Sequence, residues 1–432
     1  MGVEIIGLIG IGVLLLLLFS GMWLGFAMGF VGFLGLIYIV GFQGACKVLA
    51  TLPYTTTAFY PISALPLFVL MGLIVGSAGL STDLYDTAYK WFGRLPGGLA
   101  ISTVFASGGF AAITGSSSAS LVTIGSVALP EMKKYKYDPR LATGTVAAGG
   151  TIGILIPPSL GFILYAILTE ESIGRLFMAG IIPGILEVIF YVALIYIMCL
   201  MNPALGPRGP KTMFGEKIRS LKNTWPVLLL FALVIGGIYG GIFTPTEAGA
   251  IGAFGAMVII LLMGRLNLRG LAAGTMEALK MTGMILILVL GAFIFAHFLA
   301  LSKLPFLLSE FITGMDIPRY ATLVCIIFLY IILGMFLEIF SSILLTVPIL
   351  FPSILAMGFD PIWFGVIMVR VMEIGLITPP IGMNVFMLAG VTDTPLGTIF
   401  RGIVPFVIAD FVHVALLVIF PQISLYLPQT MF

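Results

Sequence analysis

The chain has 432 residues, of which 60% are hydrophobic and 9% are charged, whereas a soluble domain carries about 25% charged residues. Its mean hydropathy is +1.21 and its formal net charge is +2, so the composition excludes a water-soluble globular enzyme and does not suggest nucleic-acid binding. The three cysteines and two histidines lie far apart in apolar sequence and form no metal-binding or disulfide pattern. The sequence therefore predicts an all-α polytopic membrane protein.

Ten apolar segments are long enough to cross a bilayer, which takes about 20 residues. They lie at 3–20, 22–41, 62–79, 140–168, 177–201, 225–242, 246–264, 281–300, 361–390 and 402–427. The first is expected to be a retained helix, since Glu4 stands where a signal peptide carries basic residues. Amphipathic stretches at 82–95 and 304–316 follow corresponding spans and are predicted to be interfacial connecting helices.

Two further apolar stretches, 98–130 and 320–355, are too long for one span, and small polar residues interrupt each near its centre. Each is predicted to be a re-entrant helical hairpin, which enters the membrane and returns to the same side. With the N-terminus outside, 15 of the 20 Lys and Arg residues then lie inside, four lie outside, and Arg370 lies within a span. This bias agrees with the positive-inside rule, and both termini are expected on the outer side.

Residues 130–183 resemble residues 352–405 at a constant offset of 222, with ten identities in 54 positions and no gaps. Most identities are Gly, Pro or Asp-Pro, which set the shape of the backbone. Five predicted spans separate the start of one copy from the start of the other, and an odd number reverses the direction of the second copy. The pattern predicts an inverted-topology repeat, a common signature of secondary transporters.

Each repeat contains a hairpin tip and a broken helix with a Pro-Pro pair, at 114–118 and 156–159 in the first and at 338–342 and 378–380 in the second. Proline stops a helix and leaves free carbonyls and helix ends, which the membrane tolerates only inside protein or beside a wet cavity. Carbonyls and hydroxyls suit Na⁺, and helix N-termini suit a carboxylate. We therefore expect about two Na⁺ sites flanking one anionic substrate; the alternative is that these residues only let helices kink or pack closely.

Ionisable residues within the membrane are costly and usually functional. Glu338, in the second tip, is expected to bind Na⁺ or to form part of a substrate gate, unless it makes a salt bridge or lies in water. Arg370 and Glu373 are spaced for a local ion pair, and a substrate clamp by Arg370 is the alternative. Asn384 could offer an amide oxygen to a cation or satisfy a freed backbone group.

Other polar residues have simpler interpretations. Thr244 and Glu247 are typical of a helix start, so Glu247 is either a cap or a functional carboxylate. His297 and His413 are expected to pack or to hydrogen-bond rather than to bind metal. Asp410 is expected to pair with a neighbouring helix.

Five motifs together resemble the large membrane subunit of the TRAP (tripartite ATP-independent periplasmic) transporters, and the similarity covers essentially the whole chain. The motifs lie at 114–120 (TGSSSAS), 125–132 (GSVALPEM), 153–159 (GILIPPS), 244–248 (TPTEA) and 373–384 (EIGLITPPIGMN). Ser120 stands where members often have Thr or Asp, and Glu338 where Asp is common, so these two positions depart from the family pattern.

The resemblance implies an elevator-type transporter of the bacterial inner membrane that couples Na⁺ entry to symport of a small organic acid, with both termini periplasmic. It implies two partners, a small membrane subunit of about four helices and a periplasmic substrate-binding protein, and it implies no enzymatic activity. Residues 81–176 and 302–395 would form the two halves of the transport domain. Residues 1–80, 177–301 and 396–432 would form the scaffold.

Matching positions supply the expected site residues. The first Na⁺ site would use Ser116, Ser118, Gly153 and Pro157. The second would use Glu338, Ser341, Thr378, Gly382 and Asn384. The substrate would contact Ser116, Ser117, Ser159, Ser341 and Arg370. Further functional positions would be Pro158, Glu247, Glu373, Pro379 and Pro380.

Two other classes of function remain alternatives. An intramembrane hydrolase would use a serine among residues 116–118 with His297 or His413 as its base, and a stand-alone channel would need neither base nor coupling. The sequence has no P-loop, so ATP is not expected to drive transport. C4-dicarboxylates, sialic acids, keto acids and sugar acids are all possible substrates, and the lack of a fixed basic cluster favours a monocarboxylate.

Overall fold

The computed structural model describes residues 2–265, 267–315 and 317–431, and these form nineteen α-helices and one 3-10 helix. The prediction of an all-α fold is confirmed. The helices up to residue 201 are α1 (Val3–Phe19), α2 (Leu24–Thr57), η1 (Tyr60–Ser63), α3 (Ala64–Ser77), α4 (Leu80–Phe92), α5 (Gly98–Thr114), α6 (Ser117–Lys134), α7 (Pro139–Leu155), α8 (Leu160–Thr169) and α9 (Ile173–Met201). The later helices are α10 (Phe214–Tyr239), α11 (Pro245–Leu262), α12 (Leu268–Leu301), α13 (Leu304–Gly314), α14 (Arg319–Phe336), α15 (Ile339–Ala356), α16 (Pro361–Ile377), α17 (Met383–Val391), α18 (Leu396–Ile419) and α19 (Gln422–Gln429).

Nine of the described helical segments are long and apolar enough to cross a membrane, and the pair α7–α8, bent by 40°, would make a tenth. The stretches predicted as connecting helices form α4 and α13. The stretches predicted as hairpins form the helix pairs α5–α6 and α14–α15, each turning over two residues.

Four predicted spans have the wrong bounds. Helix α10 begins at Phe214 rather than at 225. Helix α2 continues past Gly41, a kink with φ 78°, to Thr57, and α12 begins at Leu268 rather than at 281. Hydropathy misses the first turns of α12 because they carry polar residues, including Glu277 and Lys280, which pair at 4.0 Å on the helix surface. The last span divides into α18 and α19 at Pro421, which cannot continue the helix because it has no backbone N–H.

The repeat in the sequence is also a repeat of helices. Adding 222 to the bounds of α6 and α7 gives 339–356 and 361–377, which are the bounds of α15 and α16. The bounds of α5 and α8 agree with those of α14 and α17 to within one residue. Matching caps explain the agreement: Asp138 accepts a hydrogen bond from Arg140 N (2.7 Å) and Asp360 from Trp363 N (2.9 Å), each with proline at the first helical position.

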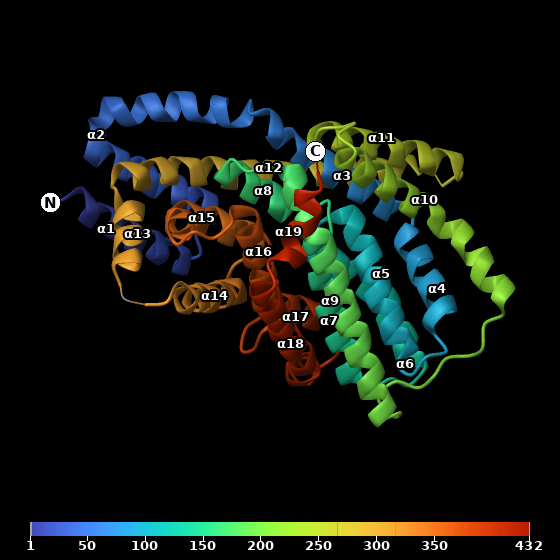
Figure 1. Cartoon of the computed structure of the whole chain (residues 1–432). Helices are drawn as coiled ribbons and strands as arrows, with labels where there is room; N and C mark the ends of the chain where they lie inside the picture. The colour runs from blue at the N-terminus through green and yellow to red at the C-terminus, as the bar shows by residue number, and fades with distance from the viewer. Residues whose placement is uncertain (1, 266, 316, 432) are drawn as a thin grey trace.

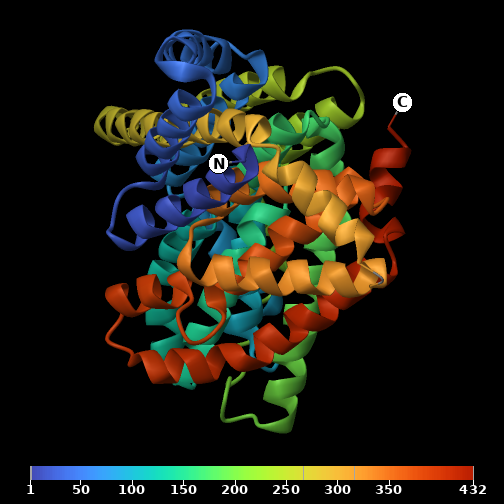
Figure 2. The ribbon, with the colours of Figure 1, turned by 90° about the vertical axis from the view of Figure 1, so that its left-hand side faces the viewer.

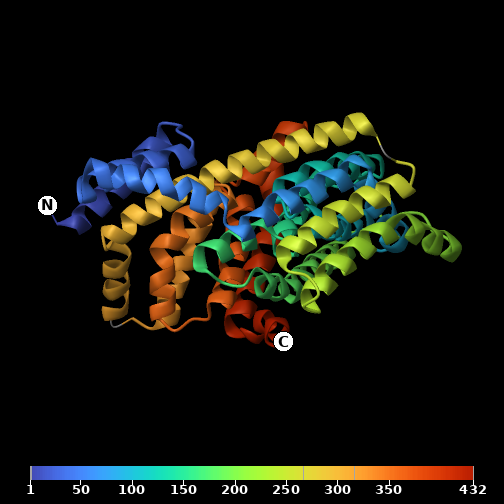
Figure 3. The ribbon, with the colours of Figure 1, turned by 90° about the horizontal axis from the view of Figure 1, so that it is seen from above.

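The two hairpins lie towards opposite ends of the molecule, with α5–α6 at one end and α14–α15 at the other (Figure 1, Figure 3). Figure 2 looks onto the end that holds α1, α13 and α14. Helices α2 and α12 run side by side along one edge (Figure 1). Their backbones touch, since a methyl group on Gly25 would lie 2.9 Å from Ile287 O and one on Gly32 would lie 2.8 Å from Phe295 N. Small residues allow this close packing of membrane helices.

The first halves of the two broken helices form the centre of the core. All residues of α7 from Leu141 to Leu155, and all of α16 from Ile362 to Ile377, are buried. The hairpin α5–α6 packs on α7, the hairpin α14–α15 packs on α16, and α7 and α16 contact each other. Each hairpin also contacts the second half of the broken helix in the other repeat, with α6 on α17 and α15 on α8. Tips and breaks of both repeats are thereby joined in one interior.

Candidate functional site

The tip of the first hairpin leaves a helix N-terminus inside the protein. Gly115 has φ of +58°, which favours glycine, and Ser116 caps α6 by accepting a hydrogen bond from Ala119 N at 3.5 Å. The hydroxyls of Thr114 and Ser120 lie 3.3 Å apart across the tip. The first N–H groups of α6 therefore lie in a buried region, at the positive end of the helix dipole.

The first broken helix is interrupted between α7 and α8. The peptide between Pro157 and Pro158 is cis, and Ser159 caps α8 by accepting a hydrogen bond from Phe162 N at 3.2 Å. Ser159 is fully buried. A second helix N-terminus thus begins inside the protein, directly after a break in the backbone hydrogen bonding.

This tip and this break are in direct contact. A methyl group on Gly115 would overlap the carbonyl oxygen of Pro158, and one on Gly153 would lie 3.1 Å from Ser116 O and 3.3 Å from Ser117 N. The hydroxyl of Ser117 is buried and has no hydrogen-bond partner among the described residues. The structure therefore brings together Ser116, Ser117, Gly153 and Pro158. Ser118 is half-buried in the first turn of α6.

The tip of the second hairpin repeats this arrangement with different side chains. Glu338 occupies the N-cap position of α15, but its side chain makes no capping hydrogen bond and is partly exposed. Ser341 is half-buried in the first turn. Ser342 is fully buried, and its hydroxyl has no partner within the described part of the chain. A carboxylate and hydroxyl oxygens therefore surround the start of α15.

The second broken helix is interrupted between α16 and α17. The hydroxyl of Thr378 donates to Ile374 O (2.6 Å), and the peptide between Pro379 and Pro380 is cis. Gly382, with φ of +58°, begins α17. Asn384 is buried, and its Nδ2 is without a partner in the described residues. Asn384 therefore lies in the first turn of α17, directly after the break.

Close contacts hold each hairpin to both repeats. A methyl group on Gly375 of α16 would lie 2.7 Å from the Cα of Gly334 in α14. One on Gly161 of α8 would lie 3.6 Å from Ile343 Cδ1 in α15, and one on Gly125 of α6 would lie 3.9 Å from Leu388 Cδ1 in α17. Four helices, α6, α8, α15 and α17, thus start at breaks in the chain. The starts of α6 and α8 are buried, whereas Glu338 before α15 is partly exposed and Pro380 before α17 is exposed.

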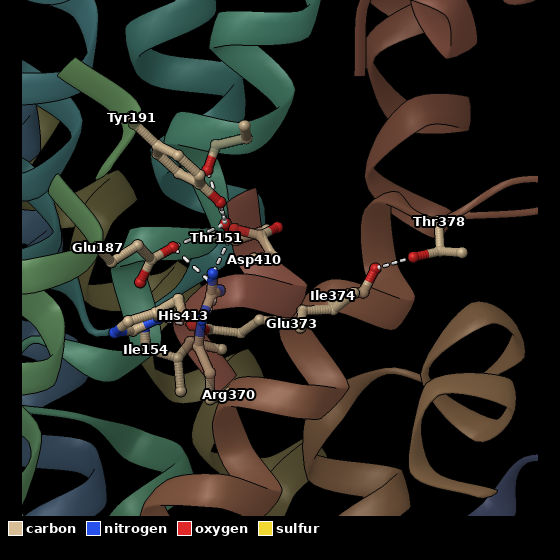
Figure 4. A network of polar contacts seen from close by, with 11 residues as sticks. Thr151, Ile154, Glu187, Tyr191, Arg370, Glu373, Ile374, Thr378, Asp410 and His413 are labelled. Carbon is tan, nitrogen blue, oxygen red and sulfur yellow. Dashed lines mark hydrogen bonds and ion pairs between the residues drawn. The ribbon is translucent and has the colours of Figure 1, made fainter. Parts of the chain in front are cut away.

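A separate network of charged side chains lies between α9, α16 and α18 (Figure 4). Arg370 Nη1 lies 3.0 Å from Glu187 Oε1 and 3.4 Å from Glu373 Oε2. Arg370 Nη2 donates to Asp410, and Arg370 Nε donates to His413 Nδ1 at 3.0 Å. All five side chains are at most 1% exposed. The predictions that Arg370 pairs with Glu373, that Asp410 pairs with another helix and that His413 hydrogen-bonds are confirmed.

The same network corrects the expectation that Arg370 contacts substrate. Its guanidinium is enclosed by three carboxyl groups and one imidazole, with no exposed surface. The network also connects to the breaks, because Ile154 N donates to Glu373 Oε1 at 3.3 Å and Thr151 Oγ1 donates to Glu187 Oε1 at 3.3 Å. Arg370 and Glu373 therefore hold the broken helices together (Figure 4).

Glu247 caps a helix. Its Oε2 accepts hydrogen bonds from the N and Oγ1 of Thr244 (2.8 and 2.9 Å), and Thr244 Oγ1 accepts one from Glu247 N (3.3 Å). The reciprocal bonds form a capping box at the start of α11, as the simpler interpretation predicted. His297 is exposed on α12, and His413 accepts a hydrogen bond from Arg370; neither histidine is hydrogen-bonded to a tip serine in the described part of the chain.

Sequence reasoning missed Glu187, Thr151 and Tyr191. Glu187 is an acidic residue inside a predicted span, and that position alone signals a buried partner. Thr151 and Tyr191 give no such signal, because a hydroxyl in an apolar helix is common; their oxygens lie 3.3 Å apart beside Glu187.

Broken helices with N-termini at the centre of a polytopic all-helical membrane protein are typical of secondary transporters, and this is the class that fold and site define. The chain belongs to the DctM component family of the tripartite ATP-independent periplasmic transporters, whose family model matches residues 11–423. The chain is thus the large permease component of such a transporter and a multi-pass inner-membrane protein.

Individual relatives agree with this family. The C4-dicarboxylate TRAP transporter large permease protein DctM of Pseudomonas aeruginosa is 35% identical over 90% of this chain and 93% of its own length. The sialic acid TRAP transporter large permease protein SiaM of Vibrio cholerae is 34% identical over 96% of both chains. Among solved structures, the YdaH transporter of Alcanivorax borkumensis has the same fold, with a TM-score of 0.63 at 16% identity over 88% of this chain and 89% of the other.

Proposed function

We propose that this chain carries a small organic acid across the inner membrane together with Na⁺, by an elevator motion of the two hairpins and the two broken helices. The observation that carries the proposal is the equivalence of the two tip–break pairs. At an offset of 222 their helix bounds agree to within one residue, and in each pair the hairpin contacts its broken helix through glycine. Two equivalent sites of this kind favour two bound cations with one substrate between them.

The oxygen atoms at both pairs fit Na⁺. In the first pair these are the hydroxyls of Ser116 and Ser118 and the backbone carbonyls near Gly153 and Pro157, where the helical hydrogen bonds end. In the second pair they are the oxygens of Glu338, Ser341, Thr378 and Asn384 and the backbone at Gly382. The buried, unpartnered hydroxyls of Ser117 and Ser342 support the proposal, because such groups are costly without a ligand.

The anionic substrate would bind at the helix N-termini. The first turns of α6, α8, α15 and α17 carry free N–H groups at the positive ends of their dipoles. Hydroxyls of Ser116, Ser117, Ser159 and Ser341 lie at three of these starts. Because Arg370 is enclosed, recognition by backbone and hydroxyl donors suits a monocarboxylate.

The moving body would include the two hairpins, the two broken helices, and α9 and α18. Sequence reasoning placed α9 (in 177–301) and α18 (in 396–432) with the scaffold. However, buried ion pairs tie both helices to α16, and separating such pairs would expose unpaired charges in an apolar medium. The scaffold would then contain α2, α3, α11 and α12, and the second repeat would run in the opposite direction through the membrane.

The family implies a small membrane subunit and a periplasmic binding protein. The test is therefore uptake of radiolabelled organic acids into proteoliposomes that contain this chain with both partners, with and without an inward Na⁺ gradient. Uptake that needs both Na⁺ and the binding protein is the expected result. Uptake driven by a proton gradient alone, or an unsaturable flux, would contradict Na⁺ symport.

Variants locate the ion sites. Ser116→Ala and Asn384→Ala are each expected to raise the Na⁺ concentration needed for half-maximal uptake by about tenfold, the effect of losing about 1.4 kcal/mol of binding. Ser126→Ala is the matched control, because Ser126 is exposed on α6 and donates only to Thr123 O. If all three variants reach half-maximal uptake at the same Na⁺ concentration, Ser116 and Asn384 are not ligands of the proposed Na⁺ sites.

A further inference from the structure

The buried network around Arg370 contains more acid than base. Glu187, Glu373 and Asp410 surround one guanidinium, and all four side chains are at most 1% exposed. The imidazole of His413 supplies no second cation, because its Nδ1 accepts a hydrogen bond from Arg370 Nε and so carries no proton. Fully ionised, the cluster would hold one positive and three negative charges, a net charge of −2.

Among the described residues, no other Lys or Arg makes an ion pair or a hydrogen bond with the cluster. The titratable groups that face it are Glu187 and Tyr191 from α9, Arg370 and Glu373 from α16, and Asp410 and His413 from α18. Helix α7 contributes Thr151 and the backbone of Ile154, which do not ionise. The neighbouring helices α5, α8, α15 and α19 contain no Asp, Glu, Lys, Arg or His in their described sequences.

Two carboxyl oxygens of the cluster are unused. Glu187 Oε2 and Asp410 Oδ2 are buried and have no hydrogen-bond partner anywhere in the described ranges. An ionised carboxylate has acceptor capacity at both oxygens, and a buried acceptor without a donor is costly. A proton on one of these oxygens removes a buried negative charge from a carboxyl group whose oxygen no donor stabilises.

The repeat places these acids around a common centre. Thr151 of α7 and Glu373 of α16 are equivalent at the offset of 222, and both reach the cluster. Glu187 of α9 corresponds to position 409 of α18, next to Asp410. The cluster therefore lies where the equivalent helices of the two repeats meet. All three of its acids lie on helices, none on a loop.

We infer that this cluster is a proton-binding site: at neutral pH it holds at least one resident proton, shared among the carboxyl groups of Glu187, Glu373 and Asp410. The ligand is the proton itself, bound between α9, α16 and α18. The three acids are not among the proposed Na⁺ ligands, although Glu373 accepts a hydrogen bond from Ile154 N, directly after Gly153. The inference rests on the charges and unpartnered oxygens of the cluster and does not depend on what the protein transports.

Infrared spectroscopy of the full chain in lipid nanodiscs at neutral pH tests the inference. A protonated carboxyl group gives a carbonyl-stretching band that shifts in D₂O. The band is expected in the wild type and is expected to lose the intensity of at least one carboxyl group in Glu187→Gln, Glu373→Gln or Asp410→Asn. Glu131→Gln is the control, since Glu131 is a partly exposed acid that pairs with Lys134. Any intensity that is lost in Glu338→Gln comes from the Glu338 carboxyl group of the second tip and not from the cluster.

The pH dependence of stability gives a second readout. If the folded chain keeps a proton that the unfolded chain releases, stability falls as pH rises from about pH 5 to about pH 8. The unfolding temperature of the wild type should therefore fall over this range, and it should fall less in the amide variant that replaces the protonated group. The inference would be overturned if all three variants kept both the carbonyl-stretching band and the pH dependence of the unfolding temperature of the wild type. Should none of the three fold, a wild-type spectrum with no band beyond that of Glu338 would overturn it equally.

Discussion

Gly115 in the first hairpin tip lies against the carbonyl oxygen of Pro158 in the first broken helix, so closely that no side chain fits between them. The two residues come from parts of the chain that are 43 positions apart, and their contact fixes how deeply the tip sits on the break. The turn at Gly115 has a positive φ, and the same turn places the residue against the Pro158 oxygen. Both features favour glycine at this position.

The first prediction concerns this contact. Gly115→Ala should destabilise the protein by about 1–3 kcal/mol, because alanine is strained at positive φ and its methyl group overlaps the Pro158 oxygen. The unfolding temperature and the uptake rate should both fall. Gly264→Ala is the matched control, since Gly264 also has positive φ (65°) but has open space around it. Similar losses in the two variants would show that the contact with Pro158 is unimportant.

The second prediction uses equivalent glycines of the two repeats. A methyl group on Gly153 would lie 3.1 Å from Ser116 O, whereas one on Gly375 would lie 2.7 Å from Gly334 Cα. Gly375→Ala should therefore lower the unfolding temperature more than Gly153→Ala does. Gly283→Ala should be neutral or stabilising by up to about 1 kcal/mol, because Gly283 is helical and has nothing near it. The measurement is the unfolding temperature of the three variants in detergent. A larger decrease for Gly153→Ala than for Gly375→Ala would contradict the packing described here.

The third prediction separates structure from binding at Arg370. Arg370→Met should destabilise the protein by about 3–5 kcal/mol, because it leaves three buried acids without their cation. Arg370→Lys should recover little, since one ammonium group cannot replace the fork that reaches Glu187, Asp410 and His413 together. Folded yield and unfolding temperature are the measurements. If Arg370→Lys is as stable as wild type but needs more substrate for half-maximal uptake, Arg370 is a substrate ligand after all.

The fourth prediction concerns the capping box of α11. Glu247→Ala should lower the unfolding temperature, because it removes both hydrogen bonds that Glu247 Oε2 accepts from Thr244. Glu247→Gln should behave like wild type, since a glutamine oxygen can accept the same bonds. Uptake measured with both variants tests whether Glu247 is also a functional carboxylate in transport. Loss of uptake in Glu247→Gln with normal stability would show that the negative charge itself is needed.

The sequence predicts most of the fold because its strongest signals are local. Asp138-Pro139 and Asp360-Pro361 each start a helix by capping chemistry that needs no distant partner, close to where the predicted spans begin, at 140 and 361. The Pro-Pro pairs likewise stop their helices wherever the rest of the chain lies. The bounds of α12 were missed because its first turns are polar, and hydropathy does not distinguish a polar helix end from a loop.

The candidate site was only partly predictable. The tip serines and Asn384 are marked by interruptions in apolar sequence, so their grouping could be expected from the repeat. The partners of Arg370 could not, because Glu187 and Asp410 lie 183 and 40 positions away, and only packing decides which buried acid a buried cation meets. Local spacing indicated Glu373 alone.

Each hairpin turns over two residues, 115–116 in the first and 337–338 in the second. One residue advances an α-helix by about 100°, so a single insertion in either turn would rotate the whole following helix away from its partners. Ser117 or Ser342 would then face a different neighbour, although every residue of the motif would still be present. The number of residues in these turns is therefore a stricter constraint than their identity, and natural variants of this protein should tolerate substitutions there more readily than changes of length.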